Sequence, residues 1–525
     1  MKTDKTAVII VGAGPVGLSM AHFLGQRQVP TLVLEAADKL PEEPRAVGLD
    51  AESLRSLQAL DMLDVLEGDL LHGMTGDYLN ENGELLFAIE DDQPGPLGYP
   101  GLASFSQPAL VSKLADQLSR YQSVELCFSH ALVDFAQDSE GVSATVEQPD
   151  GTHSSISADY LVGCDGGRST VRRQLGIAMQ GESNPRPWLV IDTHEADCDG
   201  GHKYRFFCSP QRPGMFVQTP HSTRRWEWML LPGEDREAFL EDDKIHALIS
   251  PYVDVSKVDI FRRRVYDFHA VLAERFQQGR VFIAGDAAHM TPPFAGQGLN
   301  SGMRDVANLG WKLAAVVQDG APAALLDSYE PERWGHAKEL IDIAVTLGDQ
   351  IQPIDPETAA ARDAAFEEMN KSPQTRDSFV DGIFTALLDR SFEEGAAVGL
   401  GSEYLAGRML SQPVVTDDEG NSALLDVHLG NGLAILGYNS DPETELGENL
   451  AAMWRKRGAR LIRLDDTGSS RGLRLDAGSH ISELFSKGGA NLVLLRPDRF
   501  CMAAFTGGSA EETLTKAGEL LGYQV

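Results

Sequence analysis

The sequence predicts an α/β fold in which a parallel sheet with helices is interrupted by an antiparallel sheet and followed by a smaller α/β unit. Three observations lead to this prediction. A strand, a glycine-rich turn and a helix open the chain over residues 6–28. Strand-like segments rich in aromatic residues replace the helical pattern between about 181 and 276. Strand and helix patterns alternate again after about residue 396.

The opening segment is predicted to be a βαβ unit. The run TAVIIV at 6–11 is apolar and β-branched, which is typical of a buried parallel strand. GAGPVG follows, and the apolar residues after it have helical spacing. TLVLE at 31–35 is the second predicted strand.

The glycine-rich turn is expected to bind an adenine dinucleotide. Gly12, Gly14 and Gly17 let the backbone approach a pyrophosphate, whose charge the helix N-terminus favours. Glu35 lies 18 residues after Gly17, where a carboxylate suits the adenosine ribose hydroxyls. From this unit alone the ligand is either FAD or NAD.

The remaining elements follow in chain order. A helical pattern covers 109–122, and YLVGCDG at 160–166 is a buried strand that ends in a tight turn. Short strands are predicted between these two, at 124–128, 132–136 and 142–148. Pro, Gly and Ser then divide the strand-like segments HKYRFFC, GMFVQTP and RRWEWMLLP, which indicates an antiparallel sheet. RVFIAGDAAH at 280–289 returns to the buried-strand pattern, and long helices continue to about residue 349.

Composition limits the class of protein. The 525 residues are 42% hydrophobic, which excludes global disorder. A net charge of −33 argues against nucleic acid or anionic membrane as a partner. The five cysteines include no C-x-x-C pair, so neither a disulfide framework nor a zinc site is expected. No apolar run approaches the ~20 residues of a membrane span, and we expect a soluble cytoplasmic protein.

Two later elements decide between FAD and NAD. CDGGRSTVRRQLGI at 164–177 is a second glycine-rich turn, and GDAAHMTPPFAGQGLN at 285–300, about 120 residues further on, is a third element rich in Pro and Gly. A second G-x-G-x-x-G in strand–turn–helix context, which reductases with two dinucleotide domains show, is absent from the sequence. The order and spacing of the three elements resemble those of the FAD-dependent aromatic hydroxylases, the p-hydroxybenzoate hydroxylase type, over residues 1 to about 350.

The resemblance implies both a fold and a reaction. The fold is an α/β FAD-binding Rossmann-like domain with an inserted antiparallel-sheet substrate domain. In this family NAD(P)H docks without a Rossmann domain of its own and reduces FAD. The reduced flavin then reacts with O2 to give a C4a-hydroperoxyflavin, which hydroxylates a phenolic ring. The cofactor carries the oxygen chemistry, so no catalytic acid or base is assigned.

The resemblance also assigns roles around the cofactor. Gly12, Gly14 and Gly17 would hold the pyrophosphate, and Glu35 the adenosine ribose. Arg45, in EPRAVGL, would lie beside the flavin, with a surface charge as the alternative. Further assignments are Gln107 near the ribityl chain, Asp165 with Gly166 serving both FAD and the reducing nucleotide, and Asp286 on a ribityl hydroxyl. For Asp165 a turn or cap role is the alternative.

The stretch from Asp286 to Asn300 has two other interpretations. Asp286 and His289 could belong to a metal site or activate a nucleophile, but no further ligands and no nucleophile accompany them. We therefore predict no metal, with His289 either structural or in contact with FAD. Pro293 would form a rigid wall for flavin and substrate. Ala295 to Asn300 open a helix whose free N–H groups would face the flavin pyrimidine, with Gly298, Leu299 and Asn300 as the cofactor-binding residues.

The substrate is expected to meet the antiparallel sheet. Strand alternation places Tyr204 with Phe206 on one face, and Trp226 with Trp228 on another. The pocket candidates are Tyr204, Gln218, Trp228 and Pro293. Packing in a core is the alternative for the aromatic residues.

Two longer stretches narrow the resemblance. PQRPGMFVQTPHSTRRWEWMLLPGE at 210–234 and YEPER at 329–333 are similar to the 3-(3-hydroxyphenyl)propionate hydroxylase branch. That branch has a C-terminal thioredoxin-like α/β domain, which here lacks C-x-x-C and cannot perform dithiol chemistry. Packing or contact within a homo-oligomer is its expected role.

We therefore divide the chain into four parts. The first part of the FAD-binding domain covers 1–180, and its residues 73–102 contribute to the substrate domain. The substrate-binding sheet covers 181–276. The second part of the FAD-binding domain, with linking helices, covers 277–395, and the thioredoxin-like domain covers 396–525. Two other functions stay open at this point. One is an FAD dehydrogenase or reductase without oxygen insertion, and the other is a non-catalytic protein that reuses the FAD fold.

Overall fold

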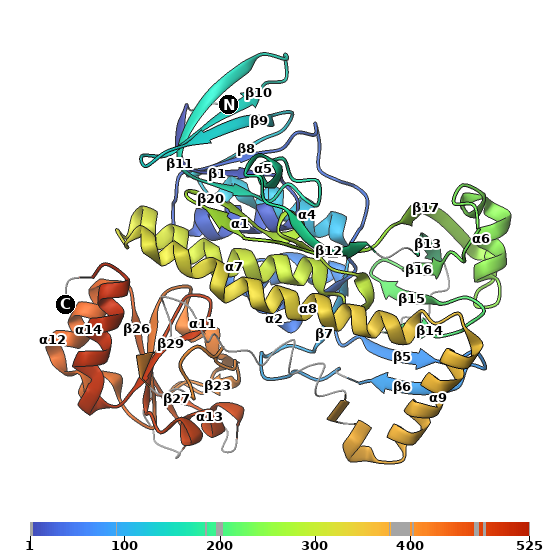
Figure 1. Cartoon of the computed structure of the whole chain (residues 1–525). Coiled ribbons are helices and arrows are strands. Elements are labelled where there is room, and N and C mark those ends of the chain that lie inside the picture. The colour runs from blue at the N-terminus through green and yellow to red at the C-terminus, as the bar shows by residue number, and fades with distance from the viewer. Residues whose placement is uncertain are drawn as a thin grey trace.

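The computed structural model contains three large sheets, of seven or eight strands each, and two small sheets of three strands each. Figure 1 shows the whole chain, with helices packed around the sheets. The described residues are 4–90, 92–183, 186–195, 203–376, 378–379, 400–401, 404–466, 472–475 and 479–523. The predicted boundary between 395 and 396 lies outside them. None of the helices in these residues has the length and apolar character needed to cross a membrane.

The first large sheet is mostly parallel and holds the dinucleotide-binding unit. Strand β1 (Lys5–Val11) pairs in parallel with β2 (Thr31–Leu34) and with β11 (His153–Gly163). Its order is β19-β20-β11-β1-β2-β8, and a β9–β10 hairpin extends β11. The remaining strands are β8 (Val124–Cys127), β9 (Ala131–Gln137), β10 (Val142–Glu147), β19 (Gln277–Gln278) and β20 (Val281–Ile283).

Helices and a small sheet cover this parallel sheet. Helix α1 (Pro15–Gln26) packs against the first half of α7 (Gln297–Gln318), and both contribute to the largest hydrophobic core. The small sheet has the order β3-β7-β4, from β3 (Gly48–Asp50), β7 (Leu102–Phe105) and β4 (Leu70–Leu71). The short helices here are α2 (Ala51–Ala59), α3 (Leu63–Leu66), α4 (Gln107–Gln117) and α5 (Thr170–Gln174).

The second large sheet has seven strands and draws on two distant parts of the chain. Its order is β17-β13-β16-β15-β14-β5-β6, antiparallel throughout except that β14 and β5 are parallel. The bounds are β5 (Thr75–Leu79), β6 (Leu85–Ile89), β13 (Trp188–Glu195), β14 (Lys203–Phe207), β15 (Gly214–Thr219), β16 (Thr223–Met229) and β17 (Val258–Tyr266). Both faces are covered, because α6 (Asp242–Ile249) packs on one and residues of α8 (Tyr329–Ile351) and α9 (Pro356–Asn370) pack on the other.

A three-stranded sheet links these two sheets. It has the order β12-β18-β21, from β12 (Met179–Ser183), β18 (His269–Ala273) and β21 (His289–Met290). The buried-strand pattern at 280–289 is therefore confirmed only for Val281–Ile283, since β20 and β21 belong to different sheets. Gly285, with φ of +60°, turns the chain between them, because that left-handed conformation ends an extended strand.

The third large sheet forms the C-terminal region. Its order is β22-β29-β28-β25-β26-β27-β23-β24. The strands are β22 (Leu400–Gly401), β23 (Val414–Thr416), β24 (Ser422–Leu424), β25 (Ala434–Tyr438), β26 (Arg460–Asp465), β27 (Leu473–Arg474), β28 (Leu492–Leu495) and β29 (Cys501–Phe505). The helices are α11 (Leu425–Leu429), α12 (Pro442–Lys456), α13 (His480–Gly488) and α14 (Ala510–Leu520).

Buried ion pairs join the C-terminal region to the helices around the parallel sheet. Glu332 of α8 accepts hydrogen bonds from Lys312 of α7 at 2.7 Å and from both terminal nitrogens of Arg496 at 2.9 Å. Asp426 of α11 accepts from Arg55 of α2 at 2.8 Å. All these side chains are buried, so separating the two regions would leave charges without partners at a high cost in free energy.

Candidate active site

A cavity of about 430 Å³ lies between the parallel sheet and the seven-stranded sheet. One wall, the cofactor wall, comes from the turns after β1, β11 and β20 and from the start of α7. The opposite wall, the sheet wall, comes from β5, β14, β15 and β16. The cofactor wall includes Gly14, Arg45, Gln107, Gly166, Asp286, Gly298 and Leu299, and the sheet wall includes Tyr78, Tyr204, Phe206, Met215, Val217, Arg225 and Glu227.

The glycines of the first glycine-rich turn have two different roles, close packing within the protein and access of a ligand to the backbone. A Cβ on Gly12, whose φ is +102°, would lie 2.5 Å from the Cys164 oxygen, and a Cβ on Gly17 would lie 2.0 Å from the Gly12 oxygen. Packing within the protein therefore requires glycine at these two positions. A Cβ on Gly14 would meet nothing within 4 Å, and Gly14 lines the cavity. Its open side is where a ligand can approach the backbone.

Glu35 ties the end of β2 to this turn. Its two carboxylate oxygens accept hydrogen bonds from the backbone N–H groups of Ala13 at 2.8 Å and Ala37 at 2.9 Å. The side chain is half-buried and adjoins the turn without lining the cavity. The protein's own hydrogen bonds thus hold the turn and the predicted ribose-binding carboxylate together.

Gln107 holds the loop that carries Arg45. Its amide oxygen accepts hydrogen bonds from the backbone N–H groups of Arg45 at 2.9 Å and Ala46 at 2.7 Å. Arg225 of β16 donates to the carbonyl oxygens of Arg45 at 2.5 Å and Pro44 at 2.6 Å. The Arg45 side chain is exposed and reaches the cavity from this fixed loop.

Asp165 has one oxygen in use and one without a partner. Oδ2 accepts hydrogen bonds from the backbone N–H groups of Thr170 at 2.7 Å and Val171 at 3.2 Å, at the start of α5. Oδ1 is buried and has no hydrogen-bond partner among the described residues. The cap role left open by the sequence is therefore present, and an acceptor remains beside Gly166, which lines the cavity.

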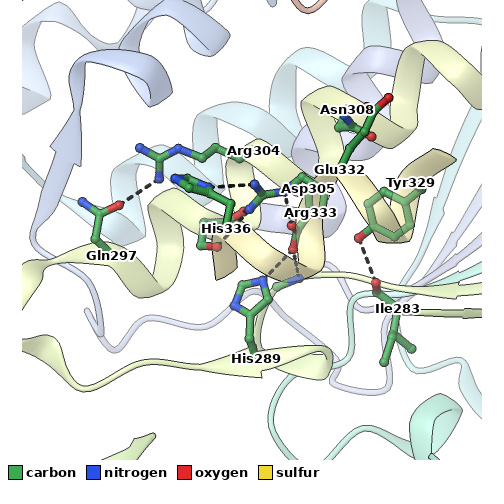
Figure 2. A network of polar contacts seen from close by, with 12 residues as sticks. Ile283, His289, Gln297, Arg304, Asp305, Asn308, Tyr329, Glu332, Arg333 and His336 are labelled. Carbon is green, nitrogen blue, oxygen red and sulfur yellow. Dashed lines mark hydrogen bonds and ion pairs between the residues drawn. The ribbon is translucent and has the colours of Figure 1, made fainter. Parts of the chain in front are cut away.

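Asp286 and His289 point to different surroundings. Asp286 is open to the cavity but enclosed by the chain, and this burial raises the pKa of its carboxyl group against the opposing charges of His289 and Arg45. His289 is fully buried, with Nε2 2.7 Å from Oδ2 of Asp305 (Figure 2). The structure thus places His289 in a network under the turn and leaves Asp286 facing the cavity.

Asp305 is the centre of that network. It accepts hydrogen bonds from the backbone N–H of Gly285 at 2.9 Å and from Arg333 at 2.8 Å, in addition to its contact with His289 (Figure 2). The pKa of Asp305 is lowered, because His289 and Arg333 outweigh its burial. The network fixes the turn of Gly285 and Asp286 onto α7. Within the described residues, no cluster of His, Cys, Asp and Glu could hold a metal ion.

The start of α7 presents backbone groups to the cavity. Gly296 precedes the helix with φ of +64°, and no side chain caps its first N–H groups. Gly298 and Leu299 line the cavity, but Asn300 does not. The Asn300 amide is used internally, since it accepts from Ser53 at 2.7 Å and donates to the Gly296 oxygen at 2.7 Å. It holds the helix start in place.

The sheet wall differs from the predicted set of pocket residues. Tyr204 and Pro293 line the cavity, but Gln218 and Trp228 do not. Tyr204 pairs with Val217, which places Val217 on the cavity face and its neighbour Gln218 on the other. Trp228 stacks on Phe207 on that other face, with ring centroids 5.5 Å apart. The sequence prediction missed Phe206, Met215, Val217, Arg225 and Glu227, which strand alternation would identify once the register with Tyr204 is known.

The cofactor wall fits a flavin dinucleotide. The open side of Gly14 suits a pyrophosphate, and the uncapped start of α7 suits acceptor atoms. The partnerless oxygen of Asp165 and the cavity-facing carboxyl of Asp286 can each accept a hydrogen bond from a sugar or ribityl hydroxyl.

Comparison with known proteins agrees with this fit. The chain belongs to the FAD-binding domain family, whose model matches residues 5–344, and the HcaD C-terminal domain matches residues 407–519. Fold, site and family together define an FAD-dependent hydroxylase, a flavoprotein monooxygenase.

The individual relatives are more specific. The chain is 38% identical over 515 residues to the 3-(3-hydroxy-phenyl)propionate/3-hydroxycinnamic acid hydroxylase of Burkholderia cenocepacia (strain HI2424), covering 95% of this chain and 94% of that protein. This confirms the resemblance to that branch. Among solved structures, a ternary complex of aklavinone-11 hydroxylase with FAD and aklavinone has a TM-score of 0.79 and 26% identity, covering 98% of this chain and 99% of that one. The flavin-dependent monooxygenase PieE, at 21% identity over 99% of both chains and a TM-score of 0.80, shares the fold.

Proposed function

We propose that this enzyme hydroxylates a phenolic ring of the size of hydroxyphenylpropionate, with NAD(P)H as reductant and O2 as oxygen donor. One observation carries the proposal. The cavity brings a cofactor wall built of backbone groups against a sheet wall that is largely apolar. The names of the relatives, which act on 3-(3-hydroxyphenyl)propionate and 3-hydroxycinnamic acid, support the substrate class.

Bound FAD would supply the electron transfer and the oxygen chemistry. The residues of the chain bind, orient and exclude water. Gly14 and the start of α7 would hold the cofactor through backbone groups, and the carboxyl groups of Asp286 and Asp165 would accept hydrogen bonds from its hydroxyls. Apolar side chains of the sheet wall, Phe206, Met215 and Val217 among them, cover the ring and keep water from the reacting atoms.

We propose that the seven-stranded sheet is the substrate domain. It supplies the sheet wall, and it contains β5 and β6 from 73–102 together with β13 to β17 from 181–276. Strands β12 and β18 fall near the ends of the second range but pair with β21 in a separate sheet. This pairing supports boundaries close to residues 186 and 268.

We propose that the C-terminal region is a thioredoxin-like domain without redox activity. The order β29-β28-β25-β26 supports this assignment, with β25 parallel to β26 and antiparallel to β28, and β28 antiparallel to β29. Helices α12, α13 and α14 follow β25, β26 and β29 in the chain order of that fold. The region has no C-x-x-C, and its one cysteine, Cys501, is buried with a raised pKa.

We place the enzyme in the cytoplasm, where NAD(P)H is available. The four described cysteines, Cys127, Cys164, Cys208 and Cys501, are free thiols, which supports a reducing compartment.

The test is a panel of phenols given to the purified, FAD-loaded enzyme with NADH or NADPH. The panel includes 3-(3-hydroxyphenyl)propionate, 3-hydroxycinnamate and 3-methylphenol. We expect at least one phenol to stimulate NAD(P)H oxidation and to gain one oxygen atom from ¹⁸O2, measured by mass. The proposal fails if no phenol stimulates oxidation, or if oxidation occurs and no product contains ¹⁸O.

A further inference from the structure

Glu227 places a carboxyl group on the sheet wall of the cavity. The side chain is 6% exposed and belongs to β16, where Val190 of β13 and Met215 of β15 are its cross-strand partners. These neighbours are apolar, and burial raises the pKa of Glu227. A carboxyl group in such a position is costly unless a donor satisfies it.

The protein itself does not provide that donor. Across the part of the chain that the structure describes, no N–H or O–H group donates a hydrogen bond to the Glu227 carboxyl. The carboxyl group lines the cavity, so a bound molecule is positioned to satisfy it.

Arg225 is close to Glu227 but is committed elsewhere. It lies two residues earlier on the same face, and Nε and Nη2 donate to Asp192 at 2.8 and 3.2 Å. Nη1 and Nη2 also donate to the carbonyl oxygens of Arg45 and Pro44. Turning Arg225 toward Glu227 would break the contacts that hold the Arg45 loop.

Other charged groups act on Glu227 from a distance. Arg262 of β17 donates to Asp192 at 2.5 Å, so Arg225, Arg262 and Asp192 form one paired cluster beside the cavity. The remaining titratable side chains that line the cavity are Arg45, Asp50, Tyr78, Cys164, Tyr204 and Asp286.

We propose that Glu227 accepts a hydrogen bond from the ring hydroxyl of the phenol and thereby selects and orients the substrate. This inference rests on the proposed function. The bond between a phenolic O–H and an ionised carboxylate is charge-assisted, and it fixes one ring atom on the sheet wall. A ring that lacks the hydroxyl leaves the carboxylate buried and unpaired, so the site discriminates strongly against it.

The hydrogen bond requires the ionised form of Glu227. Because burial raises its pKa, the ionised fraction falls as the pH drops through that raised value. Phenol binding is therefore lost on the acid side. With FAD kept saturating at every pH, so that the titration of Asp286 does not contribute, we expect an acid limb in the pH profile of kcat/KM that belongs to Glu227.

The experiment compares phenols with their O-methyl ethers in full-length, FAD-loaded enzyme. The probes are 3-(3-hydroxyphenyl)propionate and 3-methylphenol, and binding is followed by the change in flavin absorbance. We expect the wild type to bind the better phenol about 10 to 100 times more tightly than its ether. Glu227→Leu should bring the two dissociation constants within about threefold, because the acceptor is gone.

Glu227→Gln and Glu195→Gln complete the design. Glu227→Gln keeps the shape, so it should fold if the leucine variant does not, and it should lose the acid limb. Glu195 is also 6% exposed on the same sheet but is paired with Arg224 outside the cavity. Glu195→Gln should keep the phenol preference and the pH profile.

The outcomes separate the two proposals. If the wild type hydroxylates no phenol of the panel, the proposed function fails. If it hydroxylates a phenol while Glu227→Leu keeps the preference, or Glu227→Gln keeps the acid limb, the role of Glu227 is refuted and the function stands.

Discussion

The two walls of the cavity are built from different parts of the polypeptide. The cofactor wall consists largely of backbone, in turns that follow three parallel strands and at the start of α7. The sheet wall consists of side chains from strands whose other face is packed with aromatic rings. A backbone wall tolerates few substitutions because its shape depends on turn geometry. A wall of side chains can change what it binds while the sheet beneath it stays intact.

The largest effect is expected where the cofactor wall meets its own backbone. In Gly17→Ala the new Cβ would lie 2.0 Å from the Gly12 oxygen, so α1 cannot start where it does. We expect loss of bound FAD together with a large drop in the melting temperature. FAD content per chain and thermal unfolding measure this.

Gly14→Ala is the matched control for that prediction. Its Cβ would meet nothing within 4 Å, so the apoprotein should unfold at nearly the wild-type temperature. The affinity for FAD should nevertheless fall about tenfold or more, because the added methyl group occupies the open side of the turn. A Gly17→Ala protein with full FAD content would show that the turn is not rigid and would remove the contrast between the walls.

The next largest effect concerns the face of the sheet that is turned away from the cavity. Trp228 is 4% exposed and stacks on Phe207, and its ring centroid is 5.8 Å from that of Tyr252. Trp228→Ala should lower the free energy of unfolding by about 3–5 kcal/mol, the range for truncating a buried aromatic side chain. The KM for the phenol should stay within about threefold. Denaturant unfolding and steady-state kinetics measure the two quantities.

Val217→Ala on the cavity face is the counterpart of Trp228→Ala. It should cost about 1–2 kcal/mol of stability and change KM more than Trp228→Ala does. If Trp228→Ala changed KM more than Val217→Ala, the separation of a binding face from a packing face would not hold.

The difference between the walls also explains what the sequence could and could not predict. The glycine-rich turns are predictable because backbone geometry demands particular residues at fixed spacing, and the chain belongs to the FAD-binding domain family that they indicated. The face of the sheet that lines the cavity cannot be predicted in the same way. Alternation separates Gln218 from Val217 and Trp228 from Glu227, but it does not say which of the two sets faces the cavity. That choice depends on strand order and register, and β5 comes from more than a hundred residues earlier in the chain.

The prediction of a pocket role for Trp228 selected the face of the seven-stranded sheet that is turned away from the cavity. Trp228 was a predicted pocket residue, yet Trp226 and Trp228 pack with Phe207 and Tyr252 under α6. Asn300 shows the same limit at a helix start, since its amide bonds to Ser53 from a distant part of the sequence. Such partners appear only when the tertiary structure is known.

A smaller effect is expected from Asp286, a side chain on the backbone-built wall. No hydrogen bond from the described residues reaches its carboxyl, so Asp286→Asn should leave the stability of the apoprotein nearly unchanged. FAD should bind about tenfold more weakly, since a charge-assisted bond to a hydroxyl becomes a neutral one. Isothermal titration of the apoprotein with FAD gives the affinity.

The pH dependence of FAD binding adds a second readout for Asp286. Burial raises its pKa, so the wild type should lose FAD affinity as the pH falls through that value, and Asp286→Asn should not. Equal pH profiles in the two proteins would mean that the cofactor wall binds through its backbone alone.

The smallest effect separates the two roles of Asp165. Asp165→Asn keeps an oxygen that can accept from Thr170 and Val171, so α5 stays capped and unfolding should change by less than about 1 kcal/mol. The variant replaces the partnerless Oδ1 by an NH2 group, which cannot accept a hydrogen bond from a ligand hydroxyl. FAD should therefore bind a few-fold more weakly while the melting temperature of the apoprotein is unchanged. If instead stability falls and FAD affinity does not, Asp165 serves the turn alone, and the cofactor wall depends on one carboxylate fewer than we infer.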